Sequence, residues 1–388
     1  MAGLAGSSKL LRAMNESAAL ELLLDPGMLT RADLRRLTAL STPTISDLLR
    51  RLTGAGLIRV VGHASGRPGP NAEVYAANPD AAYAAAVSVR EARGGGAPSI
   101  AAAICDLSGT VVADGEWSTG DLGADPVSAV AGAVLGLGAK GGVRRERISH
   151  VRVGVPGAFD LKNEVIRLVD VPGFDQPGLV SRIGEALGIG VSVDNDVNLA
   201  AVAERRRGAG RETDNVALLW LGEDGLGLAI DIDGTLLRGT RGSAGEIGYL
   251  PVDSRHTLQD LFGGPAIMEL AREHGVGGEN PAAVVATGSD QFLAALAERI
   301  VIGLAAVTAI LDPYLIVLAG PIAHAGGEAL LAAVTSAFRR AAPLECSLAV
   351  TTIDGDAVLL GALDAGLAEV RKALIVRTFS DLGLPPGR

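Results

Sequence analysis

The stretch VSVDNDVNLAAVAE, residues 191–204, concentrates side chains that could do chemistry. A carboxylate can accept a proton from a hydroxyl group, and an amide can both donate to a hydroxyl and accept from it. Asp and Asn are also preferred at helix N-caps, and Asp stabilises the first helical turn. The stretch alone therefore predicts either a catalytic or ligand-binding site or a polar helix cap. The four side chains lie between a strand-like run and an Ala-rich helical segment: Asp194, Asn195, Asp196 and Asn198.

Glycine-rich turns at the ends of strand-like runs could complete such a site. Backbone N–H groups in these turns can approach anions, although glycine also simply makes turns. RGSAGEIGYLPV, at 241–252, places Glu246 and Tyr249 among its glycines. Each turn alone is weak evidence, so their order along the chain matters more. The other turns are VGVPGAFD (153–160), LGEDGLGLAI (221–230) and LDPYLIVLAGPIA (311–323).

Alternating strand-like and helix-like segments from about residue 83 onward must position these side chains, and they predict an α/β fold. ICDLSGTVV at 104–112 and AIDIDGTLL at 229–237 share a strand, an Asp, a Gly-Thr turn and a second strand. Each predicts a β-hairpin. A fold duplicated about a cleft, with a ligand between its halves, would produce this repeat. A chance match of two hairpins is the alternative.

The first eighty residues predict a winged helix-turn-helix. A capping box at Thr30 and Asp33 begins one helix, and Thr42-Pro43 begins a second after a tight turn. Two strand-like runs then flank a Gly/Pro-rich tip that carries Arg67. In this motif the second helix enters the DNA major groove, and a wing-tip Arg suits phosphates or the minor groove. The predicted DNA-contacting residues are Thr42, Pro43, Thr44, Ser46, Asp47, Arg50 and Arg67.

Charge is unevenly distributed along the chain. The net charge is −10, yet residues 1–80 hold nine Lys/Arg and seven Asp/Glu. Residues 48–72 contain four arginines and no acidic residue. This asymmetry favours a nucleic-acid module attached to an acidic body. The alternative is a winged helix used only for protein contacts.

Several classes of protein are disfavoured by composition. With 48% hydrophobic and 20% charged residues, the chain is globular rather than disordered. Cys105 and Cys346 cannot form a disulfide framework, and no CxxC pair indicates structural zinc, which favours a reducing cytoplasm. Charged residues interrupt the first 24 residues, and Asp312-Pro313 breaks the apolar run at 300–320. We therefore expect neither a secretory signal nor a membrane span.

From about Leu10 to about Ala368 the ordered motifs resemble the ROK family (repressors, open reading frames and sugar kinases). The resemblance implies an actin/hexokinase-like fold, with a sugar site and, in kinases, an ATP site between two lobes. It also implies a transcriptional role, because family members with an N-terminal winged helix are generally repressors of sugar-related genes. The matching motifs are GRPGPN, GVPGAFD, DNDVNLAAVAE, RGTRGSAGEIGY, GGPAI and LDPYLIVLAGPI.

The resemblance assigns candidate roles in the sugar site. Asp196 matches the family's general base, while Asn195 and Glu246 match residues that bind sugar hydroxyls. Tyr249 stands where the family has a His, and Gln259 aligns with a sugar-binding Glu. The family's Asn that usually precedes the PGW motif is replaced by Asp170, in DVPGF. The predicted ligand-binding residues are Asp170, Asn195, Asp196, Glu246, Tyr249 and Gln259.

Other departures from the family pattern disfavour catalysis. The family's cysteine-rich zinc loop is replaced by DSRHTLQDLF, so we expect no zinc. Ser88 and Arg90 stand where the first phosphate loop should have Asp and Gly, and Glu223-Asp224 stand in the second. Phosphoryl transfer depends on positioning and charge neutralisation, which these changes remove. We therefore expect no catalytic residue and no cofactor.

The sequence thus predicts a winged helix-turn-helix at 1–82, first and second ROK lobes at 83–200 and 201–370, and a C-terminal segment at 371–388. For that segment, a helix returning to the first lobe is one option. The expected function is a DNA-binding regulator, with operator DNA, a sugar effector and a homodimer or tetramer. One alternative is a regulator that has lost sugar binding, and a further one is an ATP-dependent sugar kinase.

Overall fold

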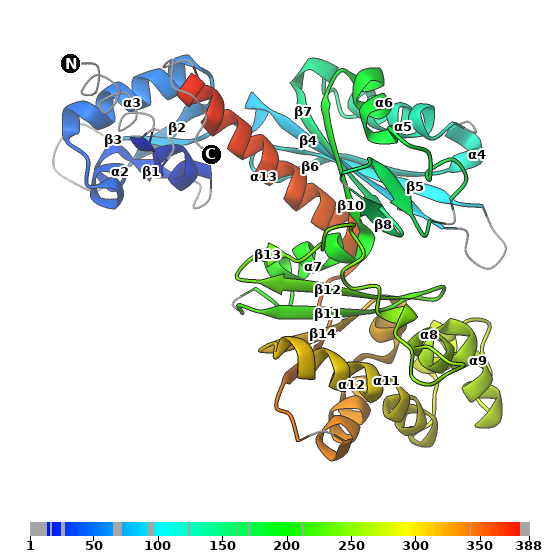
Figure 1. The fold of residues 1–388 in the computed structure, drawn as a ribbon. Coiled ribbons are helices and arrows are strands. Elements are labelled where there is room, and N and C mark those ends of the chain that lie inside the picture. The colour runs from blue at the N-terminus through cyan, green and yellow to red at the C-terminus, as the bar shows by residue number, and fades with distance from the viewer. Residues whose placement is uncertain are drawn as a thin grey trace.

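A computed structural model describes residues 14–15, 18–24, 28–64, 72–91, 97–122, 125–160, 162–169, 171–211, 213–341 and 343–380. It contains an N-terminal module and two α/β lobes, with the long helix α13 (Ala357–Ser380) running from the module to the junction of the lobes (Figure 1). The predicted fold class, a winged helix followed by a two-lobe body, is confirmed.

The N-terminal module is a small helical core closed by a three-stranded sheet of order β1-β3-β2. The Thr30–Asp33 capping box is present, and Ala39 makes the turn in a left-handed conformation. The second helix begins at Thr42 as expected, but its N-cap is Ser41, whose side chain accepts from the Thr44 N–H. Arg67 lies outside the described residues. Residues 18–24 are helical, and the other elements are β1 (Leu29–Thr30), α2 (Arg31–Thr38), α3 (Thr42–Gly54), β2 (Ile58–Ala64) and β3 (Ala72–Ala77).

The first lobe is a five-stranded mixed sheet of order β10-β7-β4-β5-β6. Side chains alternate between its two faces, as the strand period requires. Ala85 and Val87 pack with α5 and α6, whereas Ala84 and Ala86 pack with α7 and α13. The elements are β4 (Tyr83–Arg90), β5 (Ser99–Asp106), β6 (Val111–Ser118), α4 (Thr119–Leu122), α5 (Pro126–Lys140), β7 (Ile148–Val155), β8 (Ala158–Asp160), β9 (Val165–Arg167), α6 (Leu179–Leu187), β10 (Gly190–Asn195) and α7 (Asp196–Arg207).

The second lobe repeats a five-stranded sheet, of order β13-β12-β11-β14-β15, with helices against it. Both predicted hairpins are confirmed, as the pairs β5–β6 and β12–β13. The elements are β11 (Val216–Leu221), β12 (Leu226–Ile232), β13 (Thr235–Leu236), η3 (Ile247–Tyr249), α8 (Leu258–Phe262), α9 (Gly264–Glu273), α10 (Pro281–Ala286), α11 (Asp290–Leu311), β14 (Leu315–Ala319), α12 (Pro321–Ala341) and β15 (Ser347–Val350).

Helix α13 joins the N-terminal module to the first lobe. Leu367, Val370 and Leu374 belong to one buried cluster with Leu20 and Leu23 of the module. The Arg371 guanidinium also donates to the carbonyls of Leu24 (3.5 Å) and Leu107 (3.1 Å). The expected boundary at residue 370 therefore falls inside a helix, which packs along the first lobe over much of its length.

Helix α11 is long and apolar enough for a bilayer by composition, the single such helix among the residues described. Its side chains Leu296, Ile300 and Leu304 are nevertheless fully buried in the core of the second lobe. This burial is that of a core helix. Asp312, in a left-handed conformation, ends it before β14.

Candidate effector cleft and nucleic-acid interface

A cleft of about 840 Å³ lies between the two lobes. Its walls come from strand ends and glycine-rich turns of both sheets, as the duplicated-fold hypothesis expects. Five of the six predicted ligand-binding residues line it, and Asp170 lies outside the described residues. The five are Asn195, Asp196, Glu246, Tyr249 and Gln259.

Asn195 is at once a helix cap and part of the cleft wall. As the N-cap of α7, its Oδ1 accepts from the Asn198 N–H at 3.0 Å. Its Nδ2 donates to the Gly157 carbonyl and to Asp196 Oδ1, both at 3.0 Å. Asp196 Oδ1 also accepts from the Val197 N–H at 2.8 Å. The cap and site interpretations of this stretch are therefore compatible, because the capping bonds position the two side chains in the cleft.

Two carboxyl groups of the cleft, those of Asp196 and Glu246, bind protons more tightly than usual. The pKa of Asp196 is raised to about 7, mainly because the group is buried. The charges of Glu91 and Glu246 raise it further, whereas the hydrogen bond from the Val197 N–H lowers it. Burial also raises the pKa of Glu246. A carboxyl group with such a pKa can exchange a proton with a ligand hydroxyl near neutral pH.

Tyr249 and Gln259 lie in different surroundings within the cleft. Tyr249 is 64% exposed, at the mouth. Gln259 instead holds the EDGLG turn, because its Oε1 accepts from the Leu226 N–H (3.0 Å) and its Nε2 donates to the Asp224 carbonyl (3.1 Å). This bracing role was missed by sequence reasoning, since nothing local links Gln259 to a turn 33 residues earlier in the chain.

The part of the cleft where the family resemblance would place the phosphate loops carries its own ion pairs. Arg90 donates to Glu116 Oε1 at 2.7 Å and to Asp356 Oδ2 at 2.5 Å. Asp356 also caps α13, since its Oδ1 accepts from the Leu359 N–H. Glu223 and Asp224 also line the cleft. A nucleotide phosphate placed there would meet carboxylates rather than free cations.

In the segment that replaces the zinc loop, His256 is engaged by one carboxylate. Its Nδ1 lies 2.9 Å from Asp253 Oδ2, and this contact raises the pKa of His256. Over the described part of the chain, no group of three or more His, Cys, Asp or Glu side chains is placed to hold a metal ion.

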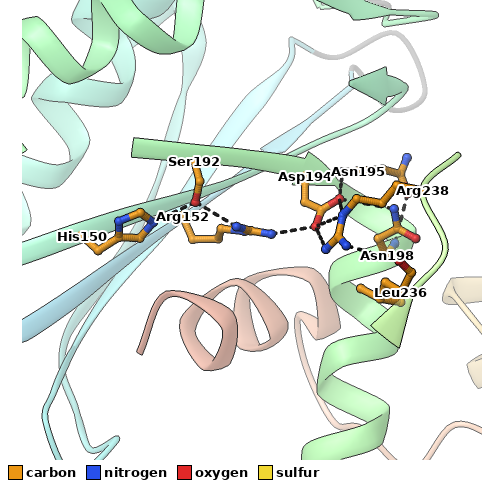
Figure 2. A network of polar contacts seen from close by, with 8 residues as sticks. All are labelled: His150, Arg152, Ser192, Asp194, Asn195, Asn198, Leu236 and Arg238. Atoms are coloured by element: carbon orange, nitrogen blue, oxygen red, sulfur yellow. Dashed lines mark hydrogen bonds and ion pairs between the residues drawn. The ribbon is translucent and has the colours of Figure 1, made fainter. Parts of the chain in front are cut away.

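Asp194, the first acid of the opening stretch, links the two lobes (Figure 2). It is 3% exposed and accepts from Arg152 of β7 at 2.7 Å. From the second lobe, Arg238 donates to the same carboxylate at 2.6 Å. The Asn198 amide completes the set at 3.3 Å. Both arginines were missed by sequence reasoning, for which the only signal was a carboxylate at the end of a buried strand.

The polar network continues from this carboxylate along the first-lobe sheet (Figure 2). Arg152 Nη1 donates to Ser192 Oγ at 2.9 Å, and His150 Nε2 lies 2.7 Å from the same oxygen. Burial lowers the pKa of His150, as does the charge of Arg152. The ion pairs at Asp194 are therefore part of a continuous network rather than an isolated contact.

The N-terminal end of α3 presents most of the predicted DNA-contacting residues. Thr42, Pro43, Thr44 and Arg50 are exposed, whereas Ser46 and Asp47 are half-buried. Asp47 binds Arg50 at 2.5 Å and Arg51 at 3.2 Å, so it partly neutralises both. Arg35 of α2 donates to Thr42 Oγ1 at 3.4 Å and adds an exposed cation that the sequence prediction did not include.

Solved structures of known proteins share this fold. A ROK family transcriptional regulator, a homologue of the E. coli MLC protein, matches with a TM-score of 0.74 at 20% identity, over 96% of this chain and 99% of that one. A ROK hexokinase from Thermus thermophilus matches with a TM-score of 0.62 at 25% identity, over 75% of this chain and 99% of that one. The regulator therefore covers nearly the whole chain, whereas the hexokinase leaves a quarter of it unmatched.

Sequence comparison gives both sugar kinases and repressors among the relatives of this chain. The xylose repressor of Bacillus spizizenii is 24% identical over 62% of this chain and 61% of its own length. The chain thus spans less than two thirds of that relative. The model of the ROK family matches residues 93–365, which is more than half of the chain. The chain therefore belongs to the ROK family.

Proposed function

We propose that this protein is a DNA-binding transcriptional regulator, a repressor of carbohydrate uptake or metabolism genes, that acts in the cytoplasm. The observation that carries the proposal is the combination of an exposed recognition-helix end with an interlobe cleft in one chain. Helix α13 connects them, since Ala357 and Val358 line the cleft and Leu374 packs against the N-terminal module. The chain's likeness to a regulator over both parts supports this function.

In this proposal α3 enters the major groove of operator DNA. Thr42 and Thr44 face outward in its first turn, where recognition helices contact bases, and Arg50 is exposed further along the helix. Two modules one DNA turn apart would read a near-palindromic site, so the active form is a homodimer or tetramer. Arg67, in the wing tip by sequence, would contact phosphates or the minor groove.

The cleft would bind a sugar effector. The Asn195 amide and the carboxyl groups of Asp196 and Glu246 line it, and such groups donate to and accept from sugar hydroxyls. For the sugar to release DNA, it must bind the DNA-incompetent form more tightly than the competent one. A sugar bound by both lobes would close the cleft and shift α13 with the module attached to it.

We infer that the body has no kinase activity. In support of this, the Arg90 guanidinium is bound by Glu116 and Asp356, and the cleft is also lined by Glu223 and Asp224, which the family resemblance aligns with a phosphate loop. The competing kinase hypothesis, to which the ROK hexokinase likeness lends some weight, predicts ADP release from ATP and a hexose that is abolished by Asp196→Asn. No turnover across a sugar panel at high enzyme concentration would remove it.

Footprinting on the protein's own upstream region, repeated with sugars and sugar phosphates, tests the regulator proposal. Arg50→Ala should weaken operator binding and lower the slope of log affinity against log salt by about one, because one phosphate contact is lost. Arg340→Ala is the matched control, an exposed arginine that is also paired with an acid. If the two variants bind operator equally well, α3 is not the DNA surface. Operator binding that no sugar alters would favour the alternative of a regulator that has lost sugar binding.

A further inference from the structure

The interlobe cleft opens at its mouth onto a second, shallower groove. The groove is lined by apolar side chains, among them Val165 and Val169, and by the charged side chains of Arg167 and Asp175. Leu168 and Tyr249 line both the groove and the main cleft. The two spaces are therefore adjacent, and a ligand in the cleft can extend past these two residues into the groove.

Leu168 stands at this mouth in a strained conformation. Its φ is 58°, a left-handed value that is unfavourable for a bulky residue, and its side chain is 54% exposed. Backbone at the start of the β8–β9 hairpin packs closely against it: a Cβ on Gly157 would lie 2.8 Å from the Leu168 carbonyl oxygen and 2.3 Å from that of Arg167. Exposing an apolar side chain at a strained position does not help folding, and such positions cluster at binding sites.

Tyr249 comes from the second lobe to the same mouth. It is 64% exposed. An exposed aromatic ring offers a flat apolar face, and sugar rings carry a matching face of C–H groups. Leu168 and Tyr249 therefore form two apolar walls, one from each lobe, suited to a sugar ring that lies beyond the polar end of the cleft.

The charge of the main cleft disfavours a phosphate group on the inner ring of a ligand, whereas the groove beyond it carries Arg167, which is paired with Asp160 at 3.4 Å. Among its described lining residues Arg90 is the one Arg or Lys, and two carboxylates already bind it. A phosphate group on the inner ring would thus enter a site of its own charge sign, without the free Arg or Lys that phosphate recognition uses. The acidic side chains that line the cleft are Glu91, Asp196, Glu223, Asp224, Glu246 and Asp356.

We propose that the effector is an unphosphorylated, uncharged saccharide of two or more rings. Its inner ring binds Asn195, Asp196 and Glu246, and its next ring lies between Leu168 and Tyr249. This rests on the proposed function, in which the cleft is the sensor. Because the two walls belong to different lobes, the outer ring adds contacts that favour the closed cleft. A disaccharide should therefore bind more tightly than its monosaccharide.

Calorimetric titration of the full chain tests this with matched probes: glucose with cellobiose and maltose, galactose with lactose, xylose with xylobiose, and glucose 6-phosphate. We expect at least one disaccharide to bind ten-fold or more tightly than its monosaccharide, and the phosphate ester to bind more weakly than glucose. Tyr249→Ala should bring the affinity ratio of disaccharide to monosaccharide close to one. Tyr314→Ala, which removes a 70%-exposed tyrosine that lines neither space, should keep the wild-type ratio.

Leu168→Gly provides a second variant, one that is not expected to destabilise the protein. Glycine accepts the left-handed conformation without strain, so this variant should melt no lower than the wild type while it also loses the disaccharide preference. A purely structural role for Leu168 would not lower that ratio in a stable protein.

Three results would overturn the proposal: equal affinity for every disaccharide and its monosaccharide, the same ratio in Tyr249→Ala and Tyr314→Ala, or tighter binding of glucose 6-phosphate than of glucose. If monosaccharides bind without a disaccharide gain, only this inference fails. If no saccharide binds while Arg50-dependent operator binding persists, both this inference and the proposed sugar sensing fail. The DNA-binding part of the proposed function then stands.

Discussion

Replacing Asp196 with Asn should stabilise the protein at neutral pH and leave its stability unchanged in acid. The substitution keeps the side-chain oxygen that accepts from the Val197 N–H and from Asn195 Nδ2. It removes only the ability to ionise. Burial raises the pKa of Asp196 from 3.8 to about 7, so ionising this group costs the folded protein free energy that the unfolded chain does not lose.

The sign and size follow from proton linkage. Below pH 3.8 the carboxyl is protonated in both states, so it contributes no difference between the variant and the wild type. As the pH rises from 3.8 to about 7, the unfolded chain loses this proton while the folded protein keeps it, and wild-type stability falls by about 1.4 kcal/mol per pH unit. Above pH 7 the difference levels off at about 4 kcal/mol, an upper value because ions entering the open cleft screen the charge.

Urea unfolding at pH values from 4.5 to 8 measures this difference. The free-energy gain of Asp196→Asn over the wild type should grow steadily up to about pH 7 and then stay constant. Asp125→Asn is the matched control, because the pKa of this exposed helix cap is lowered by its bond from the Ser128 N–H, so it titrates below the window. Asn also caps helices well. A gain for Asp196→Asn that is the same at every pH would refute the reasoning.

Two further predictions concern stability and use urea unfolding as well. Asp194→Ala should lower the free energy of unfolding by about 3–5 kcal/mol, because it leaves Arg152, whose side chain is 13% exposed, without its carboxylate. Loss of the 45%-exposed Arg238 should lower it by about 1 kcal/mol or less. Equal losses of stability in the two variants would contradict the burial assigned to the two arginines. Gly245→Ala should lower the free energy of unfolding by about 3 kcal/mol, since its φ is +95° and a Cβ would lie 1.8 Å from a backbone oxygen. Its control, Gly225→Ala, places a Cβ with no atom within 4 Å and should lower it by under about 1 kcal/mol.

Local features of this protein were predictable because short segments contain their physical cause. Thr30 and Asp33 are three residues apart, so one helical turn brings them into a capping box. Asn195 caps α7 for the same reason, through the Asn198 N–H three residues on. The hairpins β5–β6 and β12–β13 also follow from their own turns. Asp196 and Glu246 were placed in one site by family resemblance, and the fold brings both to the cleft.

Contacts between distant segments were decided only by the tertiary structure. Asp194 meets Arg152 and Arg238 from 42 and 44 residues away, on opposite sides in the sequence. No periodicity or turn signal links these positions, because which charged side chains meet depends on how the sheets of the two lobes pack. The same holds for α13, whose attachment to the N-terminal module spans 347 residues of chain from Arg371 to Leu24. The sequence by itself determined the elements and the residue types of the cleft; packing determined which lobe each wall belongs to and what connects the cleft to the DNA-binding module.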